Sequence, residues 1–246
     1  IRDYKVTGVQ TCALPIYIAE AASHEAGHAL GLSHDGRISP SESYYAGQGT
    51  WAPIMGVGYS KSLVQWSKGE YTSANNTEDD LAIISSYLGY RSDDHGNTIA
   101  TATYIPLSTS ISVAGIISSQ SDTDVFGISS GPGNLILNVD PQSRSANLDI
   151  LAELRDSSGN LIATSNPLGA LNASFNLNVD GGTYFLSVRG TGEGDPTTTG
   201  YSNYGSIGQY VVTGTVPTAG PQPPVAVASA SPEIVPVGGT ITFSGT

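Results

Sequence analysis

Residues 24–35 read HEAGHALGLSHD and contain three of the four histidines in this 246-residue chain. They continue a stretch from Tyr17 that is rich in Ala and Glu and has no proline, which predicts a helix ending near Gly31. In such a helix His24 and His28 are one turn apart and differ by only about 40° around the axis. Both imidazoles can therefore reach one metal ion.

A third ligand follows the helix. Gly31 has no Cβ and lets the chain turn sharply, so that His34 can approach the same ion. Neutral imidazoles suit Zn²⁺, and a zinc site that does chemistry keeps three protein ligands and one open position for water. We therefore predict His24, His28 and His34 as zinc ligands. Glu25 is poorly placed to bind the ion but can reach the water, which predicts a general base.

The pattern H-E-x-x-H-x-x-G-x-x-H is similar to that of the metzincin clan of zinc endopeptidases. The resemblance implies a methionine turn that forms an apolar floor beneath the histidines, and Met55 in Ala52–Gly56 is the only methionine available. Asp35 resembles the adamalysin or reprolysin-like branch, in which this Asp is buried by hydrogen bonds and does not bind zinc. Tyr59 follows Met55 by four residues, whereas astacins and serralysins place a metal-proximal Tyr two residues after it, so Tyr59 receives no role.

The rest of residues 17–91 is interpreted as the α-rich C-terminal half of such a catalytic domain. Gly, Ser, Tyr and Asn dominate residues 33–76, which predicts a long irregular loop. A capping-box spacing from Thr77 to Asp80 then predicts a second helix that runs to about Leu88. On this helix one apolar face is expected to pack against the first helix, and its members are Leu81, Ile84 and Leu88.

After Arg91 the sequence changes to short alternating segments separated by turns, which predicts an all-β sandwich over residues 92–216. The eight expected strands are 112–117, 123–129, 134–139, 147–154, 160–165, 174–179, 182–188 and 208–216. Three motifs resemble the bacterial pre-peptidase C-terminal (PPC) domain, a jelly-roll-like sandwich that accompanies secreted peptidases. They are Asp122-Thr123-Asp124-Val125-Phe126, Leu148-Asp149-Ile150 and Gly182-Thr183-Tyr184-Phe185.

Related modules bind calcium at acidic loops, and the resemblance makes Ca²⁺ a second candidate cofactor here. Asp93, Asp94, Asp122 and Asp124 could supply the hard oxygen ligands that this ion prefers, although surface acids are commonly only solvated. His95 is interpreted as a turn residue at the domain junction.

Both ends of the chain differ from its middle, and we expect the chain to be a fragment of a longer protein. Residues 1–16 include Cys12 and resemble translated sequencing adapter; the alternative is an ordinary strand that ends at Pro15. Residues 217–224 predict a Pro-rich linker. Residues 225–246 resemble the opening strands of a polycystic-kidney-disease (PKD) type β-sandwich, truncated after its start.

Lys and Arg number 9 against 21 Asp and Glu, a net charge of −12. Such a chain lacks the basic surface that nucleic acid or anionic lipid requires, and it has no apolar run long enough to span a bilayer. Apart from Cys12 it has no cysteine. These features favour a secreted bacterial protein, expected to be monomeric.

The fold class expected is thus multidomain, and the function expected is a zinc-dependent metalloendopeptidase acting on extracellular proteins or peptides. A zinc-bound water activated by Glu25 would hydrolyse the peptide bond. The fragment itself should be weakly active or inactive, because the sheet that precedes the zinc helix in metzincins has no counterpart here. Two alternatives stay open: a noncatalytic adhesion or carbohydrate-binding β-module with a protease remnant, and a metal-dependent hydrolase for another bond. Retention of Glu25 favours catalysis.

Overall fold

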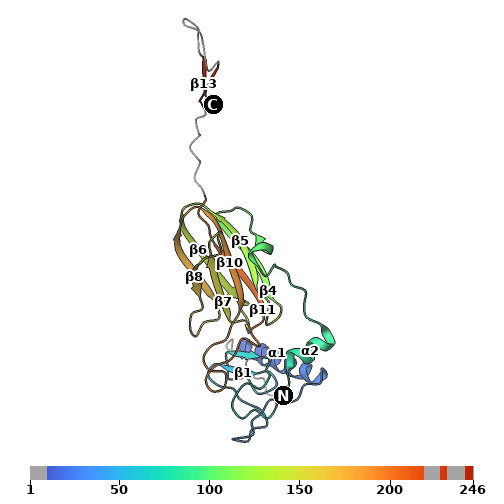
Figure 1. The fold of residues 1–246 in the computed structure, drawn as a ribbon. Helices are drawn as coiled ribbons and strands as arrows, with labels where there is room; N and C mark the ends of the chain where they lie inside the picture. The colour runs from blue at the N-terminus through green and yellow to red at the C-terminus, as the bar shows by residue number, and fades with distance from the viewer. Residues whose placement is uncertain (1–9, 219–227, 232–241, 246) are drawn as a thin grey trace.

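The computed structural model describes residues 10–218, 228–231 and 242–245 (Figure 1). The adapter-like residues 1–9, linker residues 219–224 and most of the PKD-like segment lie outside the described residues. Inside that segment, β12 (Ala228–Ser231) and β13 (Thr242–Gly245) form an antiparallel pair. In the described part of the chain, no helix is both long enough and apolar enough to cross a membrane.

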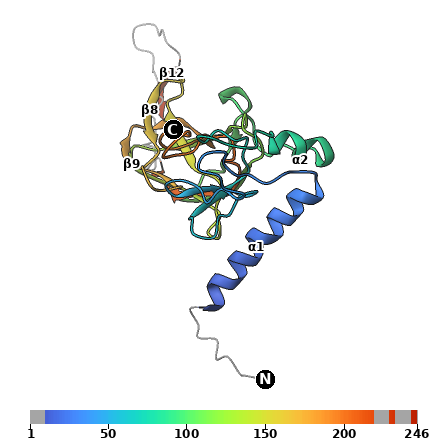
Figure 2. The same ribbon diagram turned by 90° about the horizontal axis from the view of Figure 1, so that it is seen from below.

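The zinc-motif helix is longer than predicted at one end. Helix α1 spans Gln10–Ala29, so residues 10–16 are helical and the alternative of a strand ending at Pro15 is wrong. Gly31 has φ 92° and turns the chain away from the helix axis, as expected. The N-terminal half of α1 extends away from the body of the protein, whereas its C-terminal end lies against it (Figure 2).

Residues 30–79 are mostly irregular, and the description of residues 17–91 as α-rich is therefore wrong. They contain two short strands, β1 (Trp51–Pro53) and β2 (Leu63–Gln65), which pair in parallel and which the sequence analysis missed. Three-residue strands carry too little alternation to stand out from a loop rich in Gly and Ser.

The second helix, α2, spans Asp80–Leu88, and its cap differs from the prediction. Asp79, not Thr77, is the N-cap, and its side chain accepts a hydrogen bond from the Ala82 amide at 2.9 Å. Leu81 is buried, but Leu88 is 69% exposed, so the predicted apolar face covers only the first part of the helix. Ile84 packs with Leu32, Ile54 and Met55, whereas Tyr87 and Leu88 in the last turn are exposed.

All eight strands predicted after Arg91 are present, with ends that differ by at most three residues. They are β4 (Ser110–Ile117), β5 (Asp124–Ser130), β6 (Gly133–Pro141), β7 (Ile150–Arg155), β8 (Leu161–Ser165), β9 (Ala173–Val179), β10 (Gly182–Gly190) and β11 (Gly208–Thr215). A short 3₁₀ turn (Ile99–Thr101) and β3 (Thr103–Tyr104) precede them.

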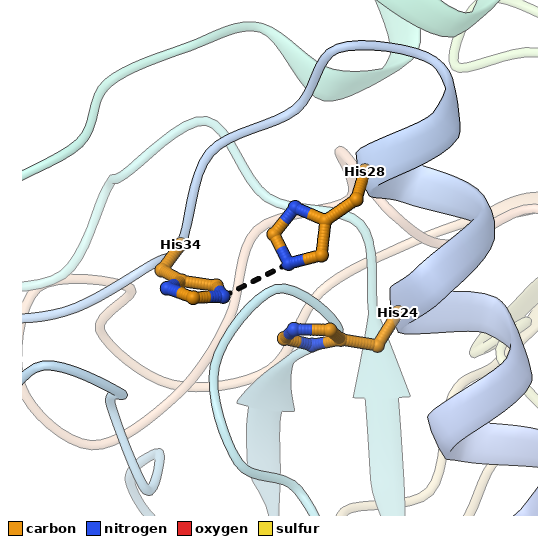
Figure 3. A group of neighbouring side chains, drawn as sticks. All are labelled: His24, His28 and His34. Carbon is orange, nitrogen blue, oxygen red and sulfur yellow. Dashed lines mark hydrogen bonds between the residues drawn. The ribbon is translucent and has the colours of Figure 1, made fainter.

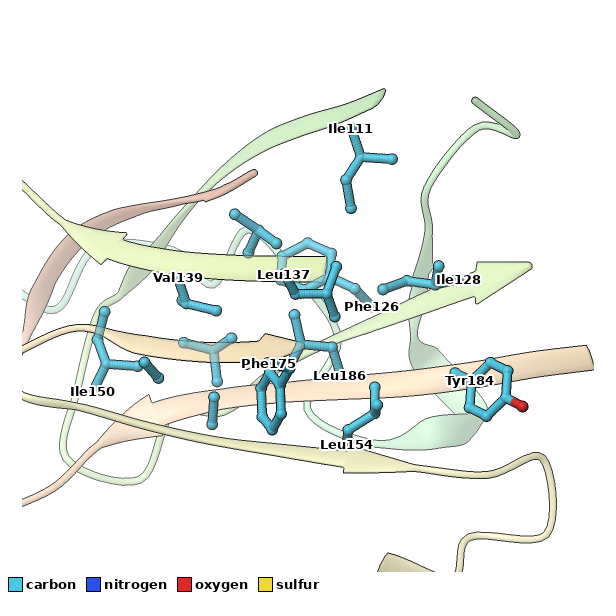
Figure 4. Packing of buried hydrophobic residues seen from close by; sticks show 14 of the residues in the cluster. Ile111, Phe126, Ile128, Leu137, Val139, Ile150, Leu154, Phe175, Tyr184 and Leu186 are labelled. Atoms are coloured by element: carbon cyan, nitrogen blue, oxygen red, sulfur yellow. The ribbon is translucent and has the colours of Figure 1, made fainter. Parts of the chain in front are cut away.

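These strands form two facing sheets, a β-sandwich. One has the order β3-β5-β10-β7-β8 and the other β4-β11-β6-β9. Along the strands, alternate side chains point inward to the core. In β7, for example, Ile150, Ala152 and Leu154 are buried and the residues between them are only partly buried. The two layers meet in one apolar core that includes Phe126, Leu137 and Leu186 (Figure 4).

The sandwich packs against residues 17–91, the part of the chain that contains the three clustered histidines. The loop between β10 and β11 lies against the loops around β1 and β2, where Tyr201 joins a buried cluster with Tyr45, Trp51, Leu63 and Tyr71. The side-chain amide of Gln48 donates to the carbonyl oxygens of Pro196 and Gly200, both at 2.7 Å. Buried apolar surface and satisfied polar groups thus join the two regions.

Asp149 lies buried at this junction, and its ionisation should make stability depend on pH. Burial raises the pKa of its carboxyl, partly offset by the hydrogen bond from the Tyr201 hydroxyl. In the unfolded chain the group ionises near pH 4, while the folded protein keeps the proton longer. The free energy of unfolding should therefore fall as pH rises from about 4 to the folded-state pKa. Denaturation of wild type and Asp149→Asn across this pH range measures this effect: the free energy of unfolding of wild type should fall with rising pH, and that of the variant should not.

Asp156 provides a control of opposite sign. It is partly exposed, and hydrogen bonds from Asn160, with smaller ones from Ser158 and Gly159, lower the pKa of its carboxyl. The free energy of unfolding of wild type should thus exceed that of Asp156→Asn above about pH 4, and the difference should disappear at lower pH. Parallel pH curves for wild type and Asp149→Asn would contradict the burial argument.

Candidate metal centre

The three histidines of the motif lie together. His24 and His28 project from α1 toward His34 on the loop that follows (Figure 3). One ring nitrogen from each lies within 4.8 Å of the others. The Nε2 atoms of His28 and His34 are 2.8 Å apart. All three side chains are partly buried, so the cluster borders the protein surface.

Backbone carbonyls fix the tautomers of the two helical histidines. His24 Nδ1 lies 2.8 Å from the Ile54 carbonyl oxygen, and His28 Nδ1 lies 2.9 Å from that of Leu32. A carbonyl oxygen only accepts, so each Nδ1 carries the proton and each Nε2 keeps its lone pair. Metal-binding histidines in proteins are held in this manner.

This donor set fits zinc. Around a tetrahedral Zn²⁺ with Zn–N distances of 2.0–2.1 Å, two nitrogens lie about 3.4 Å apart, so His28 and His34 would separate by only about half an ångström. The pKa of His34 is lowered, first by burial and then by the neighbouring His28 and His24, while Glu25 raises it. A lowered pKa keeps the imidazole neutral, which is the form that binds a metal.

Glu25 stands apart from the three nitrogens. Its side chain is exposed and does not belong to the group that could hold the ion. Its charge nevertheless acts on His34, so it lies within electrostatic reach of the cluster. The role of general base expected for Glu25 stays a prediction.

Met55 lies against α1 in a turn closed by a hydrogen bond from the Gly56 amide to the Pro53 carbonyl. It is fully buried and packs against α1 at Gly27, where an added Cβ would come within 2.5 Å of the Met55 sulfur. The same turn supplies the Ile54 carbonyl that binds His24. The turn therefore supports the helix and also orients one ligand.

Asp35 is 2% exposed, and burial, with the nearby Asp80 and Glu78, raises the pKa of its carboxyl to about 8. The expected side-chain hydrogen bonds are not observed among the described residues, and the buried Oδ2 of Asp35 has no partner there. The Asp35 amide instead donates to the Met55 carbonyl at 2.9 Å. Asp35 thus connects the third histidine to the methionine turn through its backbone.

Two tyrosines flank the site differently. The ring of Tyr44, which the sequence analysis did not select, lies 4.3 Å from that of His34, centroid to centroid. Tyr44 is half exposed, and no spacing rule would have identified it from the sequence. Tyr59 packs edge-on against Tyr17, and among the described residues its ring makes no aromatic contact with the three histidines.

A second acidic group lies at the start of the sandwich. Asp93, Asp122 and Asp124 bring carboxylate oxygens within 4.8 Å of one another, whereas Asp94 does not join them. Asp94 instead accepts a hydrogen bond from the Ile116 amide, which holds it elsewhere. The Oδ1 atoms of Asp122 and Asp124 are buried without a partner. Such unpaired buried carboxylate oxygens fit a hard cation.

His95 is a structural residue, as the sequence analysis expected. Its Nδ1 lies 3.0 Å from the Thr103 hydroxyl, and its Nε2 lies 2.9 Å from the Ala114 carbonyl. Both ring nitrogens are used within the protein, so His95 has none left for a metal.

The sequence matches no protein-family model and no curated protein. Among solved structures, the chain is similar to the pre-peptidase C-terminal domain of collagenase from Bacillus anthracis, with 16% identity and a TM-score of 0.34. That match covers 50% of this chain and 99% of the other. PliG, a periplasmic inhibitor of g-type lysozyme from Salmonella Typhimurium, is similar at 14% identity and a TM-score of 0.31, over 49% and 99% of the two chains. At these scores the similarities carry no argument about function.

Met55 offers a direct test of the support beneath the histidines. Truncation in Met55→Ala should leave a cavity under α1 and lower the free energy of unfolding by about 2–5 kcal/mol. Met55→Leu keeps most of the volume and should cost less than about 1.5 kcal/mol. Chemical denaturation of the metal-free protein measures both. Equal losses in the two variants would show that the buried volume of Met55 does not support the helix.

Proposed function

We propose that this chain carries the metal centre of a zinc-dependent metalloendopeptidase of the metzincin type. The observation that carries the proposal is the convergence of three imidazole nitrogens while the neighbouring Glu25 carboxylate remains outside the group. Two of the three imidazoles are held by carbonyls in the tautomer that directs Nε2 to the ion. The likeness of residues 24–35 to the metzincin motif adds to this geometry.

The chain's own residues perform defined tasks in this reaction. When bound, zinc supplies a Lewis acid that polarises the scissile carbonyl and lowers the pKa of coordinated water to about 7. Glu25 would accept at its exposed carboxylate the proton of the attacking water and pass that proton to the leaving amine. Such a general base contributes about 10² to 10⁴ in rate. The Ile54 and Leu32 carbonyls keep the helical imidazoles oriented throughout.

The substrate proposed is a protein or peptide outside the cytoplasm. A cavity of about 280 Å³ lies beside the zinc helix, lined by Ser23, Ile54 and Lys61 together with sandwich residues 145–147. Its position next to Ile54 suits a substrate side chain. The near absence of cysteine supports secretion. The PPC-type identity of the sandwich and the PKD-type identity of residues 225–246 belong to the same proposal.

The second function considered is a noncatalytic adhesion module that keeps a protease remnant. Nothing in the packing retains Glu25, whose side chain is exposed. A remnant would lose such a residue without loss of stability. Its retention favours the enzyme.

Two substitutions test the reaction. Glu25→Ala should lower zinc-dependent cleavage of fluorogenic peptides by about 10² to 10⁴ and leave one zinc per chain, because Glu25 is no ligand. His28→Ala should lose both the zinc and the activity. Elemental analysis and mass spectrometry of the cleaved peptides measure these outcomes. His95→Ala is the matched control and should keep the zinc. Unchanged cleavage by Glu25→Ala would remove this residue from the mechanism.

We also propose that Asp93, Asp122 and Asp124 bind Ca²⁺. The buried, unpaired oxygens of Asp122 and Asp124 support this, because a cation would compensate them. Burial, opposed by the Tyr210 hydrogen bond and reinforced by Asp122 and Asp94, raises the pKa of Asp124 to about 7. The apo site is thus electrostatically unfavourable at neutral pH.

Calcium at about a hundred times its Kd should stabilise the folded chain by about 2.7 kcal/mol. Thermal unfolding with calcium and with chelator measures the difference. Asp124→Asn should abolish the response, while Asp180→Asn, an exposed substitution, should retain it. An unfolding temperature of the wild-type protein that is the same with calcium and with chelator would contradict the proposed calcium site.

A further inference from the structure

We infer that Gln65, a buried residue of β2, is a positioning residue that connects the β-sandwich to the zinc ligand His24. The inference rests on the proposed zinc centre and adds to it a role for the sandwich. Gln65 is 1% exposed, although Gln is rarely buried so completely. Its contacts explain why a polar side chain is buried at this position.

The first part of the connection joins the sandwich to β2. The side-chain amide of Gln65 donates to the Asn147 carbonyl, in the loop between β6 and β7. With its amide nitrogen facing acceptors, Asn147 donates in turn to the Val64 carbonyl at 2.9 Å. One sandwich residue therefore holds two neighbouring residues of β2.

The second part joins β2 to the metal ligand. The Gln65 carbonyl accepts a hydrogen bond from the Ile54 amide at 2.8 Å, which continues the pairing of β1 with β2. The Ile54 carbonyl then binds His24 Nδ1, also at 2.8 Å. Hydrogen bonds thus run from Asn147 through Gln65 and Ile54 to His24. A displacement of β2 would move the carbonyl that orients this ligand.

A packing contact follows a parallel route. Sandwich residue Gly205 lies so close to β2 that a Cβ there would come within 2.6 Å of Gln65 Cβ and 2.8 Å of the Trp66 carbonyl. The Trp66 ring in turn lies 3.2 Å from the position of a Cβ on Gly27, next to His28. Trp66 therefore lies between the sandwich at Gly205 and α1 at Gly27. Both routes imply that the sandwich is part of the scaffold of the metal centre.

Gln48 provides a matched control. It is also a buried glutamine whose side-chain amide donates to backbone carbonyls of the sandwich, those of Pro196 and Gly200. Its own backbone bonds pair it with Trp51, and within the described part of the chain no hydrogen bond links it to Ile54 or to a histidine. Loss of the Gln48 amide should therefore weaken the junction without turning His24.

The experiment compares Gln65→Met and Gln48→Met in the full chain. Zinc affinity is measured by competition with a chromophoric chelator, and the visible spectrum of the Co²⁺-loaded protein reports ligand geometry. Gln65→Met should weaken zinc binding by up to about 10-fold, the low end of the effect of losing a direct partner of a ligand, because Gln65 acts on His24 through Ile54, and it should shift the cobalt bands. Gln48→Met should stay within about threefold of wild type with unchanged bands, although both variants unfold at lower temperature.

Asn147→Ala keeps the inference testable if Gln65→Met does not fold, because it removes the side-chain bonds to the Val64 and Ser145 carbonyls and leaves the Gln65 amide bonded to the backbone carbonyl of residue 147. It should weaken zinc in the same direction as Gln65→Met. A wild-type chain without stoichiometric zinc would contradict the proposed function itself. Wild-type zinc with equal affinities in the Gln65, Asn147 and Gln48 variants would contradict the positioning role alone.

Discussion

The hydrogen bond between His24 Nδ1 and the Ile54 carbonyl is the constraint on which the site depends. An imidazole can present either nitrogen, and only an acceptor on one of them fixes which nitrogen binds a metal. The helix spacing brings the rings to one side, but it does not choose their tautomers. For His24 the choice comes from a turn some thirty residues downstream, which Met55 holds against α1, whereas for His28 it comes from the Leu32 carbonyl just past the helix. The metal centre is thus a property of packed elements and not of the helix alone.

The same constraint explains how the two regions of the chain relate. A catalytic region and an accessory sandwich would ordinarily meet across a mobile junction. In this chain the junction contains a buried aromatic cluster and two buried glutamines that bond to the opposite region. Between α1 and α2 the chain forms only the short strands β1 and β2, so few regular backbone hydrogen bonds stabilise these loops. The sandwich, with its single large core, supplies the rigidity that these loops lack.

The sequence predicted best what depends on local periodicity and spacing. Alternating apolar residues located every sandwich strand from β4 to β11, and the i, i+4 histidines with Gly31 anticipated the cluster of imidazoles. It failed where three-dimensional contacts decide. Residues Trp51–Pro53 and Leu63–Gln65 become strands only because each pairs with the other and with the turn that follows. Asp94 is of a residue type that binds cations, yet its carboxylate accepts a hydrogen bond from the Ile116 amide outside the acidic group. Leu88 is of a type common in cores, yet it is exposed at the end of α2.

The central claim is that three imidazoles hold one zinc ion. X-ray absorption at the zinc edge of the loaded protein tests it most directly, because imidazole rings give a distinct scattering pattern. The geometry predicts one zinc with three imidazole nitrogens at about 2.0–2.1 Å and one further light atom. A first shell made of oxygen atoms alone, or one with fewer than three imidazoles, would contradict it.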